Sequence, residues 1–597
     1  MNVKKKLSYL LAALGLLPLL IVGLWQRPFP TASAETAATN CYNVYLPMII
    51  SGSNNAKPAA PDGDILPPQP TGNECPTGDA FPDFNGDGYG DLAIGVPDED
   101  VQQGLNYENA GAVHVIYGSA TGLEANVALA VVNDQLWHRA VDGLDDIAVD
   151  TDDAFGAALA LGDFNNDGFD DLAIGVPGST VSGETAAGAV QVLYGTADGL
   201  TTADSQTWTQ DSVLIIDEAN QDDNFGAALT AGDYNGDGFS DLAVGIPNEM
   251  VGGDANAGAV AIIYGSDDGL QSTWITANPD DFLTQDTPGF LASPAEANDR
   301  FGTTLTTGDF NGDNVDDLAV GTPFEENGAG FSNAGAVQIF LGSSDYGIVD
   351  EFNGVVNAMH IRADTAGVDN TMEAGEFFGY SLSAGNFDGD AYDDLAIGTP
   401  HETHGAGADA LQFAGAVNIV YGSASGLDPA AGAPIFHQDV AGIKGEAAEF
   451  ELFGFRLTAA DFNNDGYTDL AAGVPYDNDP AAGIIPIGSV HILRGSENGL
   501  TEAFDQQIFD PDNPEEDDAF GFAVTAVDAN GDGYPELVVG AYLDDPAGVA
   551  ADNIGSIFIF TSDGDGVAQS DNQTFYQGYG GVAGAQESDD HMGESLP

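Results

Sequence analysis

The sequence predicts an all-β protein, a seven-bladed β-propeller built from four-stranded antiparallel blades. The first observation behind this prediction is an acidic, glycine-bearing loop followed by a short apolar run, which occurs seven times at intervals of 67 to 80 residues. The second is that each interval holds four short apolar stretches, while residues 79–597 show no long 3.6-residue periodicity. Regular repeats of this length indicate one blade per repeat.

The second repeat shows the four expected strands. Its apolar stretches are residues 155–162 (FGAALALG), 171–177 (DLAIGVP) and 188–195 (GAVQVLYG), with a weaker one within 205–215. The second and third are rich in Val, Ile and Leu and end at Gly or Pro, which favours buried strands over helix. Segments such as YGTADGL recur after the third stretch and predict turns into the fourth strand.

The first repeat lacks a first strand, because only ECPTGDAFP precedes Asp83. Residues 589–596 (DDHMGESL) match residues 222–229 (DDNFGAAL), so Met592 stands where Phe225 stands in the third repeat. We therefore expect the C-terminal strand to complete the first blade. This closes the ring and leaves no free inner edge.

These units resemble FG-GAP repeats, which build the seven-bladed propeller of integrin α subunits and of many bacterial surface proteins. The resemblance covers about residues 79–597 and specifies the fold more closely than the function. The Gly-Ala-Pro element appears here as Gly-Val-Pro, Gly-Ile-Pro or Gly-Thr-Pro, and the last copy departs from it with Gly540-Ala541-Tyr542. The Phe-Gly pairs begin at Phe155, Phe225, Phe301, Phe378, Phe453 and Phe520.

Each acidic loop carries oxygen ligands at positions 1, 3, 5 and 9, with a main-chain carbonyl at position 7. Hard oxygen ligands of this kind favour Ca²⁺, and glycine at position 6 permits the left-handed turn. Position 12 is Ile174 in the second loop and a strand follows, so the loop is not an EF-hand. The expected ligands of up to seven Ca²⁺ ions are Asp83, Asn85, Asp87, Tyr89, Asp91; Asp163, Asn165, Asp167, Phe169, Asp171; Asp233, Asn235, Asp237, Phe239, Asp241; Asp309, Asn311, Asp313, Val315, Asp317; Asn386, Asp388, Asp390, Tyr392, Asp394; Asp461, Asn463, Asp465, Tyr467, Asp469; and Asp528, Asn530, Asp532, Tyr534, Glu536.

The seven loops differ in their fit to this pattern. In the fourth, Asn314 replaces the position-6 glycine, and asparagine tolerates that backbone. The fifth is the weakest expected site, because Ala391 replaces the glycine and Asn386 leads the loop. In the seventh, Glu536 replaces the position-9 aspartate. We expect the ions to pin hairpins on the lower rim, opposite the face that integrin-like propellers use for partners.

The N-terminal residues predict export. Residues 1–34 read as a signal peptide, with a basic start, an apolar run over residues 7–25 and small residues at 32–34. The apolar run is also long enough for an uncleaved membrane anchor, and in either case the propeller lies outside the cytoplasm. Residues 35–78 form an N-terminal segment with a Pro/Gly/Ser-rich linker. Cys41 and Cys75 form a disulfide, remain free, or pair with another chain.

The charge excludes two classes of partner. The chain has 11 Lys and Arg against 95 Asp and Glu, a formal net charge of −84 at pH 7. Such a surface repels nucleic acid and anionic membranes, so membrane contact is expected only through an uncleaved anchor. A soluble secreted or surface-held monomer fits this composition, and adaptation to high salt is the alternative.

We expect binding rather than catalysis, because no catalytic motif stands out. His114 and His491, like His138 and His437, recur at equivalent blade positions, which indicates packing. His401 and His404 share a loop where either could meet a metal or a ligand. The resemblance implies a calcium-stabilised adhesion protein recognising a protein or glycan on its upper face. The upper-face segments are Asn248–Asn256, Phe324–Asn333, His401–Gln412, Tyr476–Ile487, Asp345–Glu376 and Asp428–Glu451.

Two alternatives remain open at the level of sequence. The first is an extracellular hydrolase or lyase acting on carbohydrate or lipid, with Glu325, Glu326 or Glu402 in a pocket on the upper face. The second is a passive component of an envelope or matrix with no specific ligand.

Overall fold

The computed structural model describes residues 81–597, apart from short gaps. The predicted signal peptide (1–34), the predicted linker (35–78) and both cysteines lie outside the described residues. The gaps are residues 103–105, 124–133, 142, 145–147, 214, 216, 272–280, 289–293, 327–329, 345, 351–354, 369, 406–409, 479–485, 512–517, 547–552, 578–581 and 583–589.

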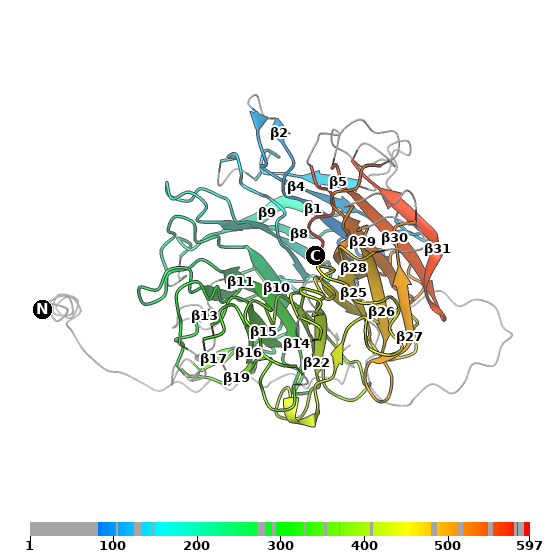
Figure 1. Ribbon diagram of the computed structural model, residues 1–597. Helices are drawn as coiled ribbons and strands as arrows, with labels where there is room; N and C mark the ends of the chain where they lie inside the picture. The colour runs from blue at the N-terminus through cyan, green and yellow to red at the C-terminus, as the bar shows by residue number, and fades with distance from the viewer. Residues whose placement is uncertain are drawn as a thin grey trace, which may run out of the picture. The chain divides into compact units, whose positions relative to one another are not determined.

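The described residues form the predicted all-β seven-bladed propeller (Figure 1). Six blades are four-stranded antiparallel meanders, and the first has three strands of its own. The first blade contains β1 (Leu92–Val96), β4 (Ala112–Ile116) and β5 (Asp134–Trp137). The second contains β6 (Leu159–Gly162), β7 (Asp171–Val176), β8 (Ala189–Tyr194) and β9 (Thr201–Trp208). The third contains β10 (Ala228–Gly232), β11 (Asp241–Ile246), β12 (Ala259–Ile263) and β13 (Asp281–Leu283).

The remaining four blades follow the same order. The fourth contains β14 (Thr304–Gly308), β15 (Asp317–Thr322), β16 (Ala336–Phe340) and β19 (Ala358–Ile361). The fifth contains β20 (Ser381–Gly385), β21 (Asp394–Thr399), β22 (Ala416–Val420) and β23 (Ile435–Phe436). The sixth contains β24 (Leu457–Ala460), β25 (Asp469–Val474), β26 (Ser489–Arg494) and β27 (Thr501–Ile508). The seventh contains β28 (Phe520–Val527), β29 (Glu536–Ala541), β30 (Ser556–Asp563) and β31 (Gly566–Phe575).

Little secondary structure lies outside the blades. Two small hairpins pair β2 (Val101–Gln102) with β3 (Asn106–Tyr107) and β17 (Val349–Asp350) with β18 (Val355–Val356). A single turn of 3-10 helix, η2, spans Pro429–Ala431. In the part of the chain that the structure describes, no helix is long and apolar enough to cross a membrane.

The hydrophobic core lies between the blades. The second and third strands of a blade, such as β7 and β8, are buried along their whole length because a neighbouring blade covers each face. The outer strand β9 is mostly half-buried or exposed. The phenylalanines of the Phe-Gly pairs, such as Phe155 and Phe225, are fully buried in these layers.

Close backbone contact joins consecutive blades and accounts for two of the repeated glycines. Gly175, in the Gly-Val-Pro element, faces the Phe-Gly turn of the next blade, where a Cβ added to it would lie 2.2 Å from the carbonyl oxygen of Gly226. Gly226 itself has a φ of +88°, a conformation that favours glycine. The adjoining Phe225 N–H donates to the Ala187 carbonyl at 2.9 Å, across the same junction. A side chain at either glycine would separate the blades.

The C-terminal residues complete the first blade, as predicted. The Gly95 N–H donates to the Ser595 carbonyl at 2.8 Å, the place where Gly175 donates to Ala158 in the second blade. Gly540 approaches Gly593 as Gly175 approaches Gly226. Figure 1 shows the C-terminus near the middle of the ring, close to β1 and β28. The ring is therefore closed by pairing the two ends of the repeat array.

This closure predicts a large cost for truncating Met592, which is fully buried. Met592→Ala should destabilise the propeller by about 2–5 kcal/mol, as expected for a large-to-small change in a core. Met250→Ala, at a methionine that is 59% exposed, should stay within about 0.5 kcal/mol of wild type. Denaturant-unfolding midpoints measure both. Equal midpoints for the two variants would mean that the C-terminal segment does not hold the ring together.

Candidate functional site

The acidic loops all lie on one end of the strands, here called the lower face. Each loop leads into the second strand of its blade, and the turns after the third strands lie at the same end. The upper face is the opposite end, where the Phe-Gly pairs and the loops after the second strands lie. The two faces carry different chemistry.

Each loop is folded around its own carboxylates, as the second loop shows. The two carboxylate oxygens of Asp163 accept the N–H groups of Asp167 (3.0 Å) and Gly168 (2.8 Å). The amide oxygen of Asn165 accepts the Asp167 N–H at 2.9 Å, and Asp167 accepts the Phe169 N–H at 3.1 Å. The side chains at positions 1, 3 and 5 therefore all turn into the loop.

The position-9 acid ties the loop to the blade. Asp171 accepts the N–H of Phe164 at 2.9 Å, and its other oxygen accepts the N–H of Gly195, beyond the third strand, also at 2.9 Å. In five other loops the position-9 acid likewise accepts the N–H of the glycine after the third strand; these acids are Asp91, Asp241, Asp317, Asp394 and Asp469. Sequence alone did not indicate this second, structural role of the position-9 acid.

Burial makes these carboxylates costly to ionise. It raises the pKa of Asp163 and of Asp233 to about 6. It raises the pKa of Asp394, Asp469 and Glu536, all at position 9, to about 8. None of the salt bridges among the described residues involves a loop carboxylate, and no loop contains Lys or Arg. The loops thus concentrate buried acids that no basic residue of the same loop offsets.

These loops fit a hard cation by donor type and by burial. Their oxygens are carboxylate, amide and carbonyl groups, the ligand set of Ca²⁺. The acids of a loop are nevertheless not among the groups of described residues whose three ligand atoms lie within 4.8 Å of one another. Their oxygens instead accept the loop's own N–H groups. The fifth loop departs further, since Asn386 donates to the Asp390 carbonyl at 2.9 Å.

Neighbouring loops are joined into a band around the lower face. The N–H at position 8 of one loop donates to the position-1 carbonyl of the previous loop, as Asp316 does to Asp233 at 3.0 Å. Gly90 donates to Asp528 at 2.8 Å and so joins the first loop to the seventh. Pro535 holds position 8 of the seventh loop and has no N–H to donate to the sixth.

The upper face carries a second set of acids, which sequence reasoning did not identify. At five blade junctions, a buried acid two residues before the Phe-Gly position lies against an acid after the second strand of the same blade. These pairs are Asp223 with Glu249, Asp299 with Glu325, Glu376 with Glu402, Glu451 with Asp477, and Asp518 with Asp544. The signal was present in the sequence as the recurrence of both acids in register.

In two of these pairs, a glutamine of the preceding blade donates a hydrogen bond to the second acid. Gln210 donates to Glu249 at 2.8 Å, and burial followed by the nearby Asp223 carboxylate raises the pKa of Glu249 to about 8. In the second blade Arg139 takes the place of the glutamine and pairs with Asp153 at 3.3 Å. There the second acid is absent and Ser179 accepts from Arg139 at 2.8 Å. At this junction the buried guanidinium of Arg139 therefore neutralises the acid, in place of a proton on the carboxylate.

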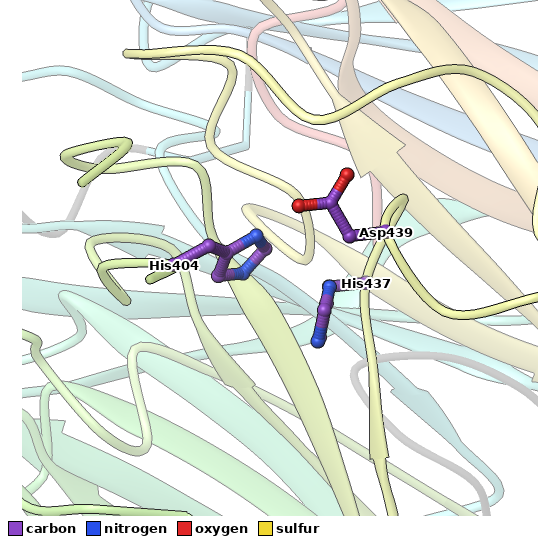
Figure 2. A group of neighbouring side chains, drawn as sticks. All are labelled: His404, His437 and Asp439. Atoms are coloured by element: carbon purple, nitrogen blue, oxygen red, sulfur yellow. The ribbon is translucent and has the colours of Figure 1, made fainter. Parts of the chain in front are cut away.

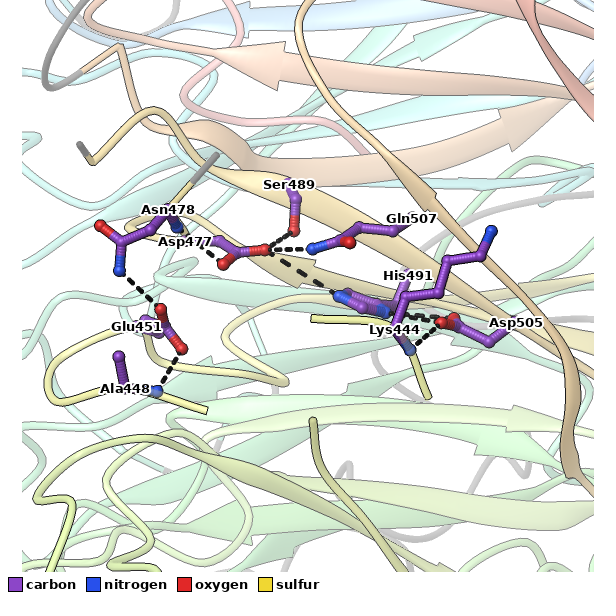
Figure 3. A network of polar contacts seen from close by, with 9 residues as sticks. All are labelled: Lys444, Ala448, Glu451, Asp477, Asn478, Ser489, His491, Asp505 and Gln507. Carbon is purple, nitrogen blue, oxygen red and sulfur yellow. Dashed lines mark hydrogen bonds and ion pairs between the residues drawn. The ribbon is translucent and has the colours of Figure 1, made fainter. Parts of the chain in front are cut away.

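The sixth blade extends this arrangement through a buried histidine (Figure 3). Asp477 accepts from Ser489 at 2.5 Å and from Gln507 at 2.7 Å. His491 lies between Asp477, 4.0 Å from its Nε2, and Asp505, 3.1 Å from its Nδ1. The packing role expected for His491 is thus combined with a polar one.

An axial cavity opens on the upper face. Its volume is about 330 Å³, within the size range of small-ligand sites. It is lined by the second residues after the Phe-Gly pairs, including Ala158, Thr304 and Ser381, and by the charged residues Arg300, Arg456 and Glu594. The cavity therefore sits where the upper ends of the inner strands converge.

Half-buried aromatic rings run beside this cavity in an unbroken series, here called the aromatic arc. Successive ring centroids lie 5.2, 6.5, 5.3, 4.9 and 4.1 Å apart. The arc comprises, in order, Phe324, Phe377, Tyr380, Phe455, Phe522 and Tyr542. Sequence analysis missed it, although the residue after the Phe-Gly pair is aromatic in three consecutive repeats, at Tyr380, Phe455 and Phe522.

Two arginines stack on the arc. The Arg300 guanidinium lies 5.0 Å from the Phe324 centroid, and that of Arg456 lies 4.9 Å from the Phe455 centroid, both within cation–π range. Neither forms an ion pair within 4.0 Å among the described residues. Arg456 nevertheless interacts electrostatically with Glu594, which lines the same cavity.

The glutamates considered for catalysis do not meet in one place. Glu325 and Glu402 are buried at separate blade junctions, each against an acid of its own blade. Glu326 is exposed. None of the three lines the axial cavity, whose acidic side chain is Glu594.

The junction acids predict a pH-dependent stability. The pKa of Glu249 is about 8 in the folded protein against an ordinary 4.5, so the folded state holds the proton more tightly than the unfolded state. Stability should therefore fall as pH rises from about 4.5 to about 8. Glu249→Gln should remove part of this fall and melt above wild type at pH 8, with little difference at pH 4.5. Glu184→Gln, at an exposed acid, is the control, and a Glu249→Gln curve parallel to wild type would contradict the prediction.

Comparison with known proteins agrees with this architecture. The model of the family described as FG-GAP repeat matches residues 77–116, 155–193, 225–263, 301–340, 378–417, 453–487 and 520–560. Integrin alpha-PS2 of Drosophila melanogaster is 31% identical over 269 residues, which are 44% of this chain and 16% of that protein. Phosphatidylinositol-glycan-specific phospholipase D of Bos taurus is 32% identical over 200 residues, 33% of this chain and 22% of that protein.

These matches span less than a quarter of each relative's own length. Among solved structures, that of an exotype rhamnogalacturonan lyase aligns with a TM-score of 0.32 at 14% identity, covering 70% of this chain and 65% of that chain. A likeness this weak carries no argument about function. The seven matched repeats, one in each blade, and the integrin α relatives together show that the chain is an FG-GAP repeat protein with an integrin-α-like propeller.

Proposed function

We propose that this protein is an extracellular adhesion or binding protein, stabilised by Ca²⁺ on its lower face, that recognises a protein or glycan ligand on its upper face. The integrin α relatives support binding in general. The observation that carries the proposal is the axial cavity, where two arginines stack on the aromatic arc. Specific sites on propellers usually lie where loops and inner strands converge in this way.

The chemistry of the cavity favours a ligand with an acidic group and a flat or apolar face. A guanidinium stacked on an aromatic ring can still direct N–H groups at a carboxylate, at best with two parallel hydrogen bonds. Arg456 already donates from one terminal nitrogen to the Phe455 carbonyl at 3.2 Å, and its other N–H groups would bind the ligand. The aromatic faces suit a sugar ring or an aromatic side chain. A uronic-acid glycan and an acidic peptide both offer this combination. The overall charge of −84 repels anions at long range, so close contacts must supply the affinity.

On the lower face, Ca²⁺ would neutralise the acids that burial now makes costly to ionise. Positions 1, 3, 5 and 9 and the position-7 carbonyl supply the ligands, and the fifth loop is the weakest candidate because Asn386 leads it. The position-9 acid also accepts a hydrogen bond from the glycine after the third strand. Ca²⁺ bound to this acid would therefore stabilise the blade as well as the loop. In this proposal Ca²⁺ stabilises the fold, and the upper face binds the ligand.

A hydrolytic or lytic activity is the second candidate. The phospholipase D relatives favour it, since segments covering 33% and 41% of this chain are similar to them. Against it stands the separation of Glu325 and Glu402 from the axial cavity. Product release in a screen of polysaccharides and lipids would support this candidate, whereas binding without turnover supports adhesion.

Calcium should stabilise the protein more at pH 8 than at pH 5. In the metal-free folded state the pKa values of Asp394, Asp469 and Glu536 are about 8. Since these values are raised, the metal-free protein loses stability as pH rises through about 4 to 8. Ca²⁺ binds the ionised carboxylates and should reverse that loss, adding stability by mass action. Melting temperatures of metal-free protein with and without excess Ca²⁺ measure the effect at each pH.

The control for this experiment is NaCl at equal ionic strength, because salt alone screens repulsion in a chain of this charge. Calcium stabilisation that NaCl matches, or that does not grow with pH, would remove the case for ions in the loops.

Binding to acidic ligands should depend on the two axial arginines. Arg456→Gln and Arg300→Gln should each weaken binding by about tenfold or more, because a hydrogen bond to a charged group is worth about 1.5–3 kcal/mol. Arg362→Gln, at an arginine already paired with Asp364 at 3.3 Å, should bind as wild type does. The probes are immobilised uronic-acid oligosaccharides and acidic peptides, each beside its neutral counterpart. Equal binding by all three variants would place the ligand site elsewhere.

A further inference from the structure

His404, His437 and Asp439 form a cluster on the fifth blade, separate from the acidic loops (Figure 2). One ligand atom from each residue lies within 4.8 Å of the others. Figure 2 shows the two rings projecting toward each other from different segments, with the carboxylate on one side. His404 comes from the loop after β21, while His437 directly follows β23. The cluster therefore joins an upper-face loop to the outer strand of its blade.

Three of the four histidine nitrogens in this cluster are buried without a hydrogen-bond partner. His404 is only 9% exposed, and neither of its ring nitrogens has a hydrogen-bond partner. The Nδ1 of His437 is also buried without a partner. The two ring centroids are 3.9 Å apart. Leaving polar atoms buried and unpaired costs free energy, so a ligand that pairs with these nitrogens would stabilise the folded state.

The backbone positions the three side chains without help from a metal. His404 and Leu411 exchange two main-chain hydrogen bonds, of 3.0 and 2.9 Å. The His437 carbonyl accepts the Val440 N–H at 2.9 Å in a tight turn. Asp439 accepts the Ala447 N–H at 3.3 Å, which orients its carboxylate. A ligand set held in place in this way loses little entropy on binding.

We propose that His404, His437 and Asp439 bind a first-row transition-metal ion, with Zn²⁺ as the best fit. Two imidazole nitrogens and one carboxylate oxygen are typical zinc ligands, whereas Ca²⁺ prefers oxygen alone. Asp439 is exposed, so the fourth position faces solvent and accepts water or a donor atom of a ligand. Burial, followed by the adjacent His437, lowers the pKa of His404 to about 4, which keeps the ring neutral and able to coordinate.

Other buried histidines do not share this arrangement. His114 also has two buried nitrogens without partners, but it lies within β4 and belongs to no cluster of metal-ligating atoms among the described residues. His138 follows β5 as His437 follows β23, and its Nδ1 accepts the Ala140 N–H at 3.2 Å. Only the fifth repeat adds a histidine in the loop after the second strand to one after the fourth. His138 therefore supplies a matched control.

The bound ion would fix the loop that flanks the aromatic arc. His401, three residues before His404, lies 4.7 Å from Phe377 of the arc and 4.5 Å from Phe413, measured between ring centroids. Both His401 and Phe413 lie in or beside the loop that the metal would tie to β23. Zinc would thus order one wall of the upper face, whereas calcium would act on the lower face.

The test uses the full chain saturated with Ca²⁺, after removal of transition metals with a chelator that leaves Ca²⁺ bound. Zn²⁺ titration by calorimetry should show one site per chain above any weak surface binding. Co²⁺ in the same site should give the visible absorption of a four-coordinate ion. His404→Gln and Asp439→Asn should each weaken Zn²⁺ binding by at least about tenfold, since loss of an outer-sphere partner alone costs about 10–100-fold.

His138→Gln should keep wild-type affinity. Because Asp439 is exposed, Asp439→Asn should fold normally even if His404→Gln does not, and melting in Ca²⁺ verifies both variants. Unchanged Zn²⁺ affinity in Asp439→Asn, a six-coordinate Co²⁺ spectrum, or an equal loss in His138→Gln would overturn the proposal.

Discussion

The propeller depends on backbone contact at the blade junctions. Each blade presents a glycine of its second strand to the Phe-Gly turn of the next, at a distance that excludes a Cβ, as between Gly175 and Gly226. The last such contact, between Gly540 and Gly593, uses the C-terminal end of the chain to close the circle. Because every junction is built alike, the loops at either end of the strands are free to differ without disturbing the ring.

Burying acids without bases is the second constraint. The described part of the chain has few basic side chains. One of them, Arg139, pairs with Asp153 at the one junction where it takes the place of a second acid. At other junctions the raised pKa favours the protonated acid, or a glutamine donates a hydrogen bond to it, as Gln210 does to Glu249. Protons and one arginine thus offset the same desolvation cost at different junctions, and Ca²⁺ is our proposal for the lower face.

The two faces differ in how closely they follow the repeat. The lower face repeats one loop with small variations, and its carboxylates bond mainly to their own backbone. The upper face breaks the repeat: the aromatic arc, the axial arginines and the His404 cluster occur in only some blades. Departures from a repeat are where a scaffold of identical units acquires specificity.

The sequence by itself determined the all-β repeat, the blade number, the order of strands and the closure through Met592, because these follow from local patterns that recur in register. It also located the acidic loops. The tertiary structure alone decided which side chains meet: Arg456 with Tyr380 and Phe522 at the axis, and His404 with His437 across the fifth blade. These contacts join residues from different strands or blades, and their distances depend on how the blades pack around the ring, which no local pattern encodes.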